Sequence, residues 1–413
     1  MSRNLMLMVM VAALIGVRPN VLFAQGQRPQ LYTSKTFVVR TDLPPAEANQ
    51  LMVNLESMMK LVSSYFGRPC RKPIRMFIVR DLSNWPAEEV QQFPETGRQH
   101  ILENAGVTVT SVRGIVGGPK LDADAVVYAV PDHGIPQHEA IHAYCGITFG
   151  ELGPVWYSEG MAEVGKYFRD RELGVSASKG VIAYLKSQSP KPLLEIVNNP
   201  LEQTGDSWQN YAWRWAICHL LGSNTNYAQR FKPLGLALLA GTDTSFQAVY
   251  GMQIPEIEFE YQLFLKDVEP GYRNDLCSWD WTTKFRQASP RSEVSSRVEA
   301  GRGWQASKAI VKAGETYQIT TTGEWTLEKG AMPVSAAGDG QGRGELVGVI
   351  FDNYRLSEPF VIGGARTFRV PQDGKLFLRC RDDWGSVADN KGALVVKIIQ
   401  VIPQPPSPNS ADR

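Results

Sequence analysis

Residues 136–163, PQHEAIHAYCGITFGELGPVWYSEGMAE, decide how the middle of this chain folds. Pro136 suits the first turn of a helix that continues to about Cys145. A second run, 155–168, is also typical of a helix. The connection between them, 146–154, is short and contains three glycines. The stretch therefore predicts two neighbouring antiparallel helices.

The first of these helices contains the pattern His138-Glu139-Ala140-Ile141-His142. Residues four apart lie on one face of a helix, so both imidazoles can reach the same ion. Zinc accepts neutral imidazole nitrogens at about 2.0–2.1 Å and tolerates three protein ligands together with a water molecule. Glu139 lies about 100° round the helix from His138. It would flank the ion and could take a proton from that water, whose pKa zinc lowers to about 7.

Two histidines leave one protein ligand missing, and Glu159 in the second helix could supply it. Glu163 lies on the same face four residues later, where it could accept a hydrogen bond from the outer nitrogen of a ligand imidazole. The HExxH pattern also arises by chance on merely amphipathic helices. Because the chain has only five histidines, two of them in this pattern, we favour the zinc site.

The elements HEAIH and PVWYSEGMAE resemble the gluzincin metallopeptidases, and look most similar to a secreted bacterial branch of that clan. The resemblance extends over about 36–272, with its specific part at 136–168. It implies zinc-dependent peptide hydrolysis, and does not support aminopeptidase activity, because a Gly-x-Met-x-Asn-type element is not found. The residues to which it gives roles are the ligands His138, His142 and Glu159, the catalytic base Glu139 and the supporting residue Glu163.

Gluzincins also need a donor that stabilises the tetrahedral oxyanion, commonly a Tyr or His from a later helix. The run 211–221, YAWRWAICHLL, predicts such a helix and offers Tyr211 and His219. Both share a face with Trp215, so this face could equally be packed core. We keep both residues as catalytic candidates and leave the core alternative open.

The segments around this site predict an α+β fold for 31–272. Runs of β-branched and alternating residues predict strands at 36–40, 74–80 and 125–130. Longer periodic runs predict further helices at 45–66, 227–239 and 254–265. Since strands come first and helices later, the order favours α+β over a doubly wound sheet.

The C-terminal part has a different pattern. Residues 273–303 include a stretch rich in Ser, Arg and Glu, and predict a linker or a lead-in strand. Short alternating segments separated by glycine-containing turns predict an all-β sandwich over 304–401. These segments are 317–321, 345–351, 367–370, 375–378 and 393–399. The Pro- and Ser-rich tail, 402–413, is predicted to be disordered.

The runs AGETYQIT (313–320), GEW (323–325) and GELVG (344–348) resemble the calcium-dependent galactose-binding lectins of bacteria. The segment DDWGSVADNKG, 382–392, matches the calcium loop of that family. The resemblance implies Ca²⁺ and a glycan partner, and calcium takes six to eight oxygens at about 2.3–2.6 Å. The implied ligands are the side chains of Asp382, Asp389 and Asn390 and the carbonyl of Ser386, with Leu327 as a further carbonyl candidate. Asp and Asn clusters are also common turn formers.

The N-terminus and the charge indicate where the chain acts. Arg3, the apolar run 5–17 and a small residue at Ala24 predict a secretory signal peptide over 1–24. A disordered or lipid-facing N-terminus is the alternative; a membrane anchor is disfavoured because a span needs about 20 apolar residues. The net charge of +1 gives no basis for binding nucleic acid or an anionic membrane. We expect a secreted or periplasmic protein without a membrane span after cleavage.

The leading hypothesis is therefore an exported zinc peptidase (a hydrolase) acting on a peptide or protein, with an appended carbohydrate-binding-like domain. The competing class is a surface or secreted adhesion protein, a lectin whose zinc domain is not catalytic. The presence of Glu139 argues against that class, because a structural zinc site needs no base.

Overall fold

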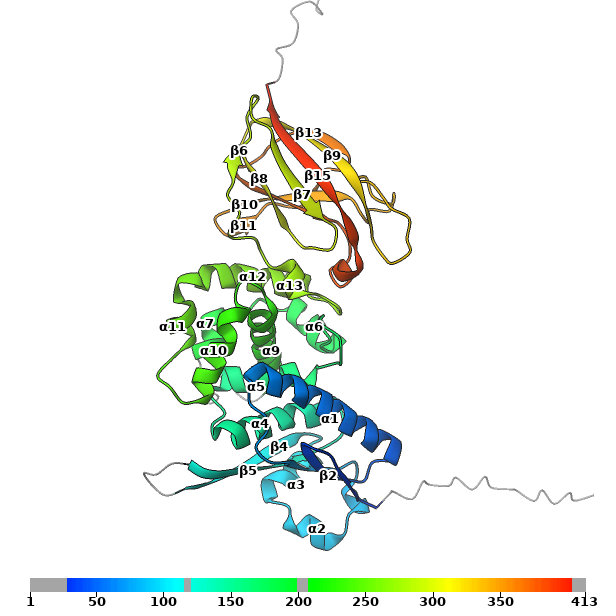
Figure 1. The fold of residues 1–413 in the computed structure, drawn as a ribbon, viewed down its shortest axis with the longest axis vertical. Coiled ribbons are helices and arrows are strands. Elements are labelled where there is room, and N and C mark those ends of the chain that lie inside the picture. Colours follow the sequence, from blue (N-terminus) through cyan, green and yellow to red (C-terminus); the bar gives the residue numbers. More distant parts are fainter. Residues whose placement is uncertain (1–27, 115–119, 199–206, 403–413) are drawn as a thin grey trace, which may run out of the picture.

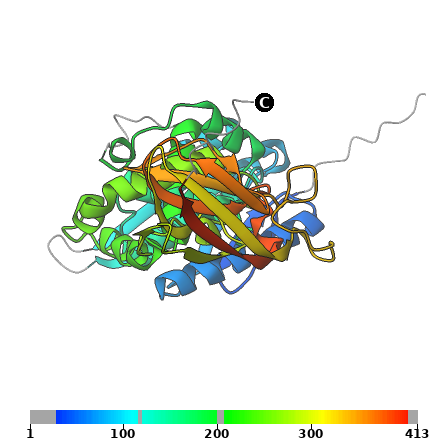
Figure 2. The same cartoon turned by 90° about the horizontal axis from the view of Figure 1, so that it is seen from above.

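The computed structural model describes residues 28–114, 120–198 and 207–402. The predicted signal peptide and all but the first residue of the predicted tail lie outside these ranges. The described chain is a mixed α/β region, then a helical middle, then a largely β region, which confirms the predicted fold class (Figure 1). The α/β and β regions lie at opposite ends of the long axis (Figure 1). In the view along that axis, the β region lies in front of the other two (Figure 2).

A five-stranded mixed sheet forms the first region. Its strand order is β1-β2-β3-β5-β4. The three central strands are parallel to one another, and β1 and β4 are antiparallel edges. The bounds are β1 Gln30–Thr33, β2 Phe37–Thr41, β3 Ile74–Ile78, β4 Gly106–Gly114 and β5 Lys120–Ala129. The strands predicted at 36–40, 74–80 and 125–130 are thus present, and both edge strands are additions.

Helix α1, Pro45–Phe66, begins after Pro44 and ends at Gly67, whose left-handed backbone (φ 68°) suits glycine. It buries residues three and four apart, such as Leu51, Leu55 and Met58. The first region also contains the short helices α2 (Ala87–Gln92) and α3 (Glu95–Leu102), and a single-turn η1 (Leu82–Asn84).

The helical middle is built around α4, Ile135–Phe149, and α5, Val155–Lys166. Helix α5 packs between α4 and α9, Trp208–Ser223, while α4 packs on β4 and β5. One apolar core runs from β2 and α1 through these helices to Tyr272. The remaining helices are α6 Lys179–Ser187, α7 Leu193–Asn198, α10 Ala228–Leu239, α11 Phe246–Tyr250, α12 Ile254–Asp267 and α13 Asn274–Cys277, with η2 at Gly251–Gln253.

Two sheets make the C-terminal region, and a separate apolar core fills the space between them. Their strand pairs are antiparallel except for β6 and β8, which are parallel. One has the order β11-β10-β14-β8-β6, with β12 also paired to β10, and the other β13-β9-β15-β7. The bounds are β6 Arg286–Gln287, β7 Val294–Glu299, β8 Gln305–Val311, β9 Thr316–Thr326, β10 Leu346–Asp352, β11 Arg355–Leu356, β12 Phe360–Val361, β13 Ala365–Arg369, β14 Gly374–Cys380 and β15 Lys391–Val401. Strands β6 and β7 come from the stretch predicted as a linker or lead-in strand, so the sheets begin before Trp304.

Where the helical middle meets the sandwich, aromatic rings from both sides form one cluster that includes Phe259, Trp279 and Phe377. Beside it the buried carboxylate of Glu260 on α12 accepts five hydrogen bonds, from Asn224 Nδ2, Asn226 Nδ2, Tyr227 Oη, Trp279 N and Trp281 Nε1, at 2.6–2.9 Å. One side chain thus fastens the α9–α10 connection and the start of the C-terminal region to α12.

Glu260→Gln should destabilise the protein by about 2–5 kcal/mol, because an amide nitrogen would then face donors that the carboxylate now satisfies. Urea unfolding, followed by tryptophan fluorescence, measures the change. Glu258→Gln, on the same helix but only half-buried, is the matched control and should change the unfolding free energy by less than about 0.5 kcal/mol. Equal midpoints for the two variants would contradict the role assigned to Glu260.

Candidate metal centre

Glycines at both ends of α4 set up the pair of helices. Gly134 precedes the helix with φ 74°, and Gly150 ends it with φ 76°. Gly153, at φ 74°, then turns the chain into α5, which starts after Pro154. These left-handed positions suit glycine and bring α5 back against α4, as the short connection predicted.

Three of the predicted ligands meet between these helices. His138 Nε2 lies 3.3 Å from Glu159 Oε2, and His142 Nε2 lies 3.4 Å from the same oxygen. The two Nε2 atoms are 3.1 Å apart. Both histidines are buried, and Glu159 is half-buried. Within the described ranges, His138, His142 and Glu159 form the group of His, Cys, Asp and Glu side chains that could hold a metal ion.

The other imidazole nitrogens are engaged elsewhere. His138 Nδ1 lies 3.0 Å from Glu163 Oε1, and because a carboxylate only accepts, this nitrogen donates. His142 Nδ1 lies 3.2 Å from the Ser158 hydroxyl. When a metal ion takes the place of the second ring proton, the His138 ring presents an Nε2 lone pair toward the second imidazole and a carboxylate. Such a set of converging acceptors is satisfied by a cation, so the residues fit a metal ion.

The titration behaviour of these side chains also favours positive charge. Burial lowers the pKa of His138, but its hydrogen bonds to Glu159 and Glu163 outweigh burial and raise this pKa to about 10. Burial likewise opposes ionisation of Glu159, yet the two imidazoles hold the pKa of its carboxyl well below the usual range. A divalent cation would supply the charge that a proton supplies in this set.

Lys166 also binds the Glu163 carboxylate, with its Nζ 2.9 Å from the oxygen, Oε1, that accepts from His138. Removing the charge of Glu163 should loosen the orientation of His138. Glu163→Gln is expected to weaken metal affinity about 10–100-fold, the range for partners that orient metal ligands. Competition with a zinc chelator measures this, and Glu172→Gln, an exposed position, is the control. Unchanged affinity in Glu163→Gln would remove Glu163 from the site.

The carboxylate of Glu139 lies next to the triad on α4 and is buried. Its Oε2 accepts a hydrogen bond of 2.7 Å from the Thr108 hydroxyl, which also contacts the Glu139 carbonyl at 2.9 Å. Thr108 is on the edge strand β4 and was not identified from the sequence. The alternation in GVTVTSVRG could have indicated a strand, but nothing local marks which residue contacts Glu139.

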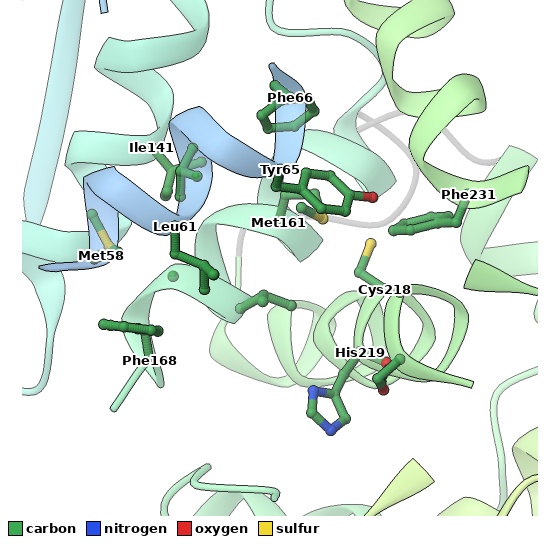
Figure 3. A pocket seen from close by; sticks show the side chains of 15 residues that line it. Met58, Leu61, Tyr65, Phe66, Ile141, Met161, Phe168, Cys218, His219 and Phe231 are labelled. Carbon is green, nitrogen blue, oxygen red and sulfur yellow. Dashed lines mark hydrogen bonds between the residues drawn. The ribbon is translucent and has the colours of Figure 1, made fainter. Parts of the chain in front are cut away.

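The structure brings one of the two oxyanion candidates to the triad. The ring centroids of Tyr211 and His138 are 5.9 Å apart. His219 lies eight residues further along α9, about 12 Å at 1.5 Å per residue. Its ring contacts are Trp215, at 5.2 Å, and Phe264, at 5.9 Å, and it lines an apolar pocket (Figure 3). Within the described residues, no contact joins His219 to the three ligands.

The predicted calcium loop has unsatisfied polar atoms. Asp382 Oδ2 and both polar side-chain atoms of Asn390 are buried without a hydrogen-bond partner in the described part of the chain. Asp382 Oδ1 instead accepts from Arg343 Nε at 2.9 Å. The Ser386 carbonyl accepts from Asp389 N at 3.3 Å, and the Asp389 side chain is exposed. Oxygens of Asp382 and Asn390 fit a cation, but the guanidinium of Arg343 already neutralises part of that charge.

The comparisons with known proteins identify no family. No family model matches the chain, and no curated protein matches it. Solved structures with similarity include the N-terminal domain of EclA, a PllA-like lectin, at 21% identity over 26% of this chain and 95% of that chain, with a TM-score of 0.23. They also include PliG of Aeromonas hydrophila, a periplasmic inhibitor of g-type lysozyme, at 12% identity over 29% and 98%, TM-score 0.15, and a protein of Bacillus endospore appendages, at 12% over 27% and 87%, TM-score 0.13. At these values the similarities are limited, so function is inferred from the residues of the chain itself.

Proposed function

We propose that this protein is a zinc-dependent peptidase, with His138, His142 and Glu159 as the zinc ligands. The observation that carries the proposal is the triad, whose ligand atoms lie within 4.8 Å of one another, with the buried carboxylate of Glu139 next to it on the same helix. Three protein ligands are typical of catalytic zinc sites, whereas structural sites have four. A base beside a three-ligand site supports hydrolysis rather than a structural role.

Zinc bound there would polarise the scissile carbonyl and lower the pKa of a bound water to about 7. Glu139 takes the proton of the attacking water and later gives it to the leaving amine. The Thr108 hydroxyl orients the carboxylate of Glu139 through its 2.7 Å hydrogen bond. Tyr211, beside His138, donates its hydroxyl hydrogen to the developing oxyanion.

The position of β4 supports a peptide as the substrate. This strand pairs with β5 on one side, and no described strand pairs with its other edge. It also packs against α4 and contacts Glu139 through Thr108. An extended peptide can add to such an edge by main-chain hydrogen bonds. Its scissile bond would then lie beside the metal-binding helix.

The test of this proposal is cleavage of a quenched peptide library by the purified protein. We expect hydrolysis that phenanthroline abolishes and added zinc restores. A protein that contains zinc but cleaves no peptide would favour the alternative, a carbohydrate-binding or adhesion protein whose zinc domain is not catalytic.

The sandwich region supports a second, separate proposal, binding of Ca²⁺ and a glycan by the loop 382–392. It rests on the unpartnered oxygens of Asp382 and Asn390, and it requires Arg343 to move away from Asp382. Calcium titration by calorimetry should show one site, and Asp382→Asn should weaken it at least about tenfold. Asp383→Asn, an exposed neighbour, is the matched control. Absence of a calcium signal in the unchanged protein would leave Arg343 as the permanent partner of Asp382.

A further inference from the structure

An apolar pocket lies on the α1 side of α4 and α5, and the zinc proposal does not use it (Figure 3). It has a volume of about 230 Å³ and is lined by residues of α1, α4, α5, α9 and α10, among them Leu61, Ile141, Met161 and Phe231. Apolar cavities of about 150 Å³ already bind molecules such as benzene. The pocket is therefore large enough for a small apolar ligand.

One polar group in this apolar wall lacks a partner. The Tyr65 hydroxyl is buried and has no hydrogen-bond partner within the described residues. The half-buried ring of His219 also lines the wall and contacts the rings of Trp215 and Phe264. Burial lowers the pKa of His219 to about 4, so this imidazole is neutral near pH 7. A buried polar group without a partner costs free energy that a ligand can recover.

The pocket also lacks charge. None of the described residues that line it is a Lys, Arg, Asp or Glu. Lys232 is the cation near Tyr65, with Nζ 5.8 Å from the ring centroid, but it is not part of the wall. A charged head group would lose its hydration here without gaining an ion pair. The chemistry of the wall therefore selects a ligand that is apolar along its length and carries an uncharged hydrogen-bonding head.

We propose that this pocket binds a free, neutral, single-chain amphiphile, with its hydroxyl or carbonyl head at Tyr65. At about 30 Å³ for an atom the size of water, the cavity has room for about eight such atoms, which corresponds to a medium-length chain. Its occupant contacts both metal-binding helices, since Ile141 lies between His138 and His142 and Met161 follows Glu159 by two residues. Occupancy thus stabilises the packing of α4 against α5.

Octanol is the probe, and octanoate is its charged counterpart. Calorimetry on the full chain should show one octanol site, with octanoate binding at least about tenfold more weakly because its carboxylate must be desolvated. Octanol should also raise the midpoint of thermal unfolding, because a ligand that binds the folded state stabilises it. Equal binding of the two probes, or no octanol binding, would overturn the proposal.

Gly222→Leu fills the pocket. Gly222 is exposed on α9, and a Cβ there would meet the Phe231 ring at 3.5 Å, an ordinary contact, so the helix should tolerate the change. Octanol binding should be lost. Gly180→Leu, on the exposed face of α6, is the matched control and should bind octanol normally. Undiminished binding by Gly222→Leu would place the ligand elsewhere and reject this pocket.

Tyr65→Phe separates a binding role from a structural one. Removing a buried hydroxyl without a partner should raise the thermal midpoint of the ligand-free protein, while octanol affinity falls several-fold. A fall in both quantities would indicate that the hydroxyl only supports the fold. The unchanged protein should not sediment with phosphatidylcholine vesicles. If it does and Gly222→Leu does not, the pocket binds a membrane lipid, and the proposal of a free ligand is overturned.

Discussion

Glu139→Gln should abolish peptide hydrolysis, with kcat reduced by at least about 10³-fold, while zinc content stays near that of the unchanged protein. The amide has nearly the shape of the carboxylate and can keep a hydrogen bond to Thr108, so the fold should survive. It cannot take a proton from water. Steady-state cleavage of a quenched peptide and elemental analysis of the same preparation measure the two quantities.

Glu88→Gln is the matched control for this variant, because Glu88 is exposed and lies on α2. Its activity should equal that of the unchanged protein. If Glu139→Gln cleaved peptide at the normal rate, Glu139 would not be the base. If neither the unchanged protein nor Glu139→Gln cleaved peptide, while both kept another biological activity, the binding-protein hypothesis would replace the peptidase hypothesis.

Glu159→Ala should lower zinc affinity by roughly 10²–10³-fold, since it removes one of three protein ligands. The loss leaves His138 Nε2 and His142 Nε2 only 3.1 Å apart without the carboxylate oxygen that both now face. Competition with a fluorescent zinc chelator measures the affinity. Peptide hydrolysis should fall in parallel at limiting zinc and recover partly when zinc is in excess.

Glu195→Ala, at a half-exposed position on α7, is the control for Glu159→Ala. It should bind zinc as tightly as the unchanged protein. Normal zinc affinity in Glu159→Ala would mean that another residue completes the coordination. Circular dichroism shows whether a loss of zinc from Glu159→Ala is due to unfolding. A folded variant without zinc supports Glu159 as a ligand. If the variant is unfolded, Glu159→Gln is measured in its place.

The parts of the site that could be predicted from the sequence are those set by short-range geometry. Helix spacing places His138 and His142 on one face, and the glycines of the short connection bring Glu159 to them. Glu163 follows from the same periodicity and lies 3.0 Å from His138. These relations depend on residues within one helical hairpin, so no knowledge of the rest of the fold is needed.

Contacts between distant segments could not be predicted in this way. Thr108 reaches Glu139 only because β4 pairs with β5 at the edge of the sheet, which is a property of strand order. From the sequence, Tyr211 and His219 are equal candidates, because both lie on one face of the same helix. Only the packing of α9 brings Tyr211 to His138 and His219 to the apolar pocket. The same holds for strand β7. Its exposed positions carry polar and charged residues that are also typical of a linker, and its pairing with β15, a distant segment, makes it a strand.

The most direct test of the central claim is the zinc content of the mature protein, purified without added metal and measured by elemental analysis. We predict close to one zinc per chain in the unchanged protein and in Glu139→Gln, and a clear loss in Glu159→Ala. No zinc in the unchanged protein, even after reconstitution and dialysis, would contradict the assignment of His138, His142 and Glu159 as zinc ligands.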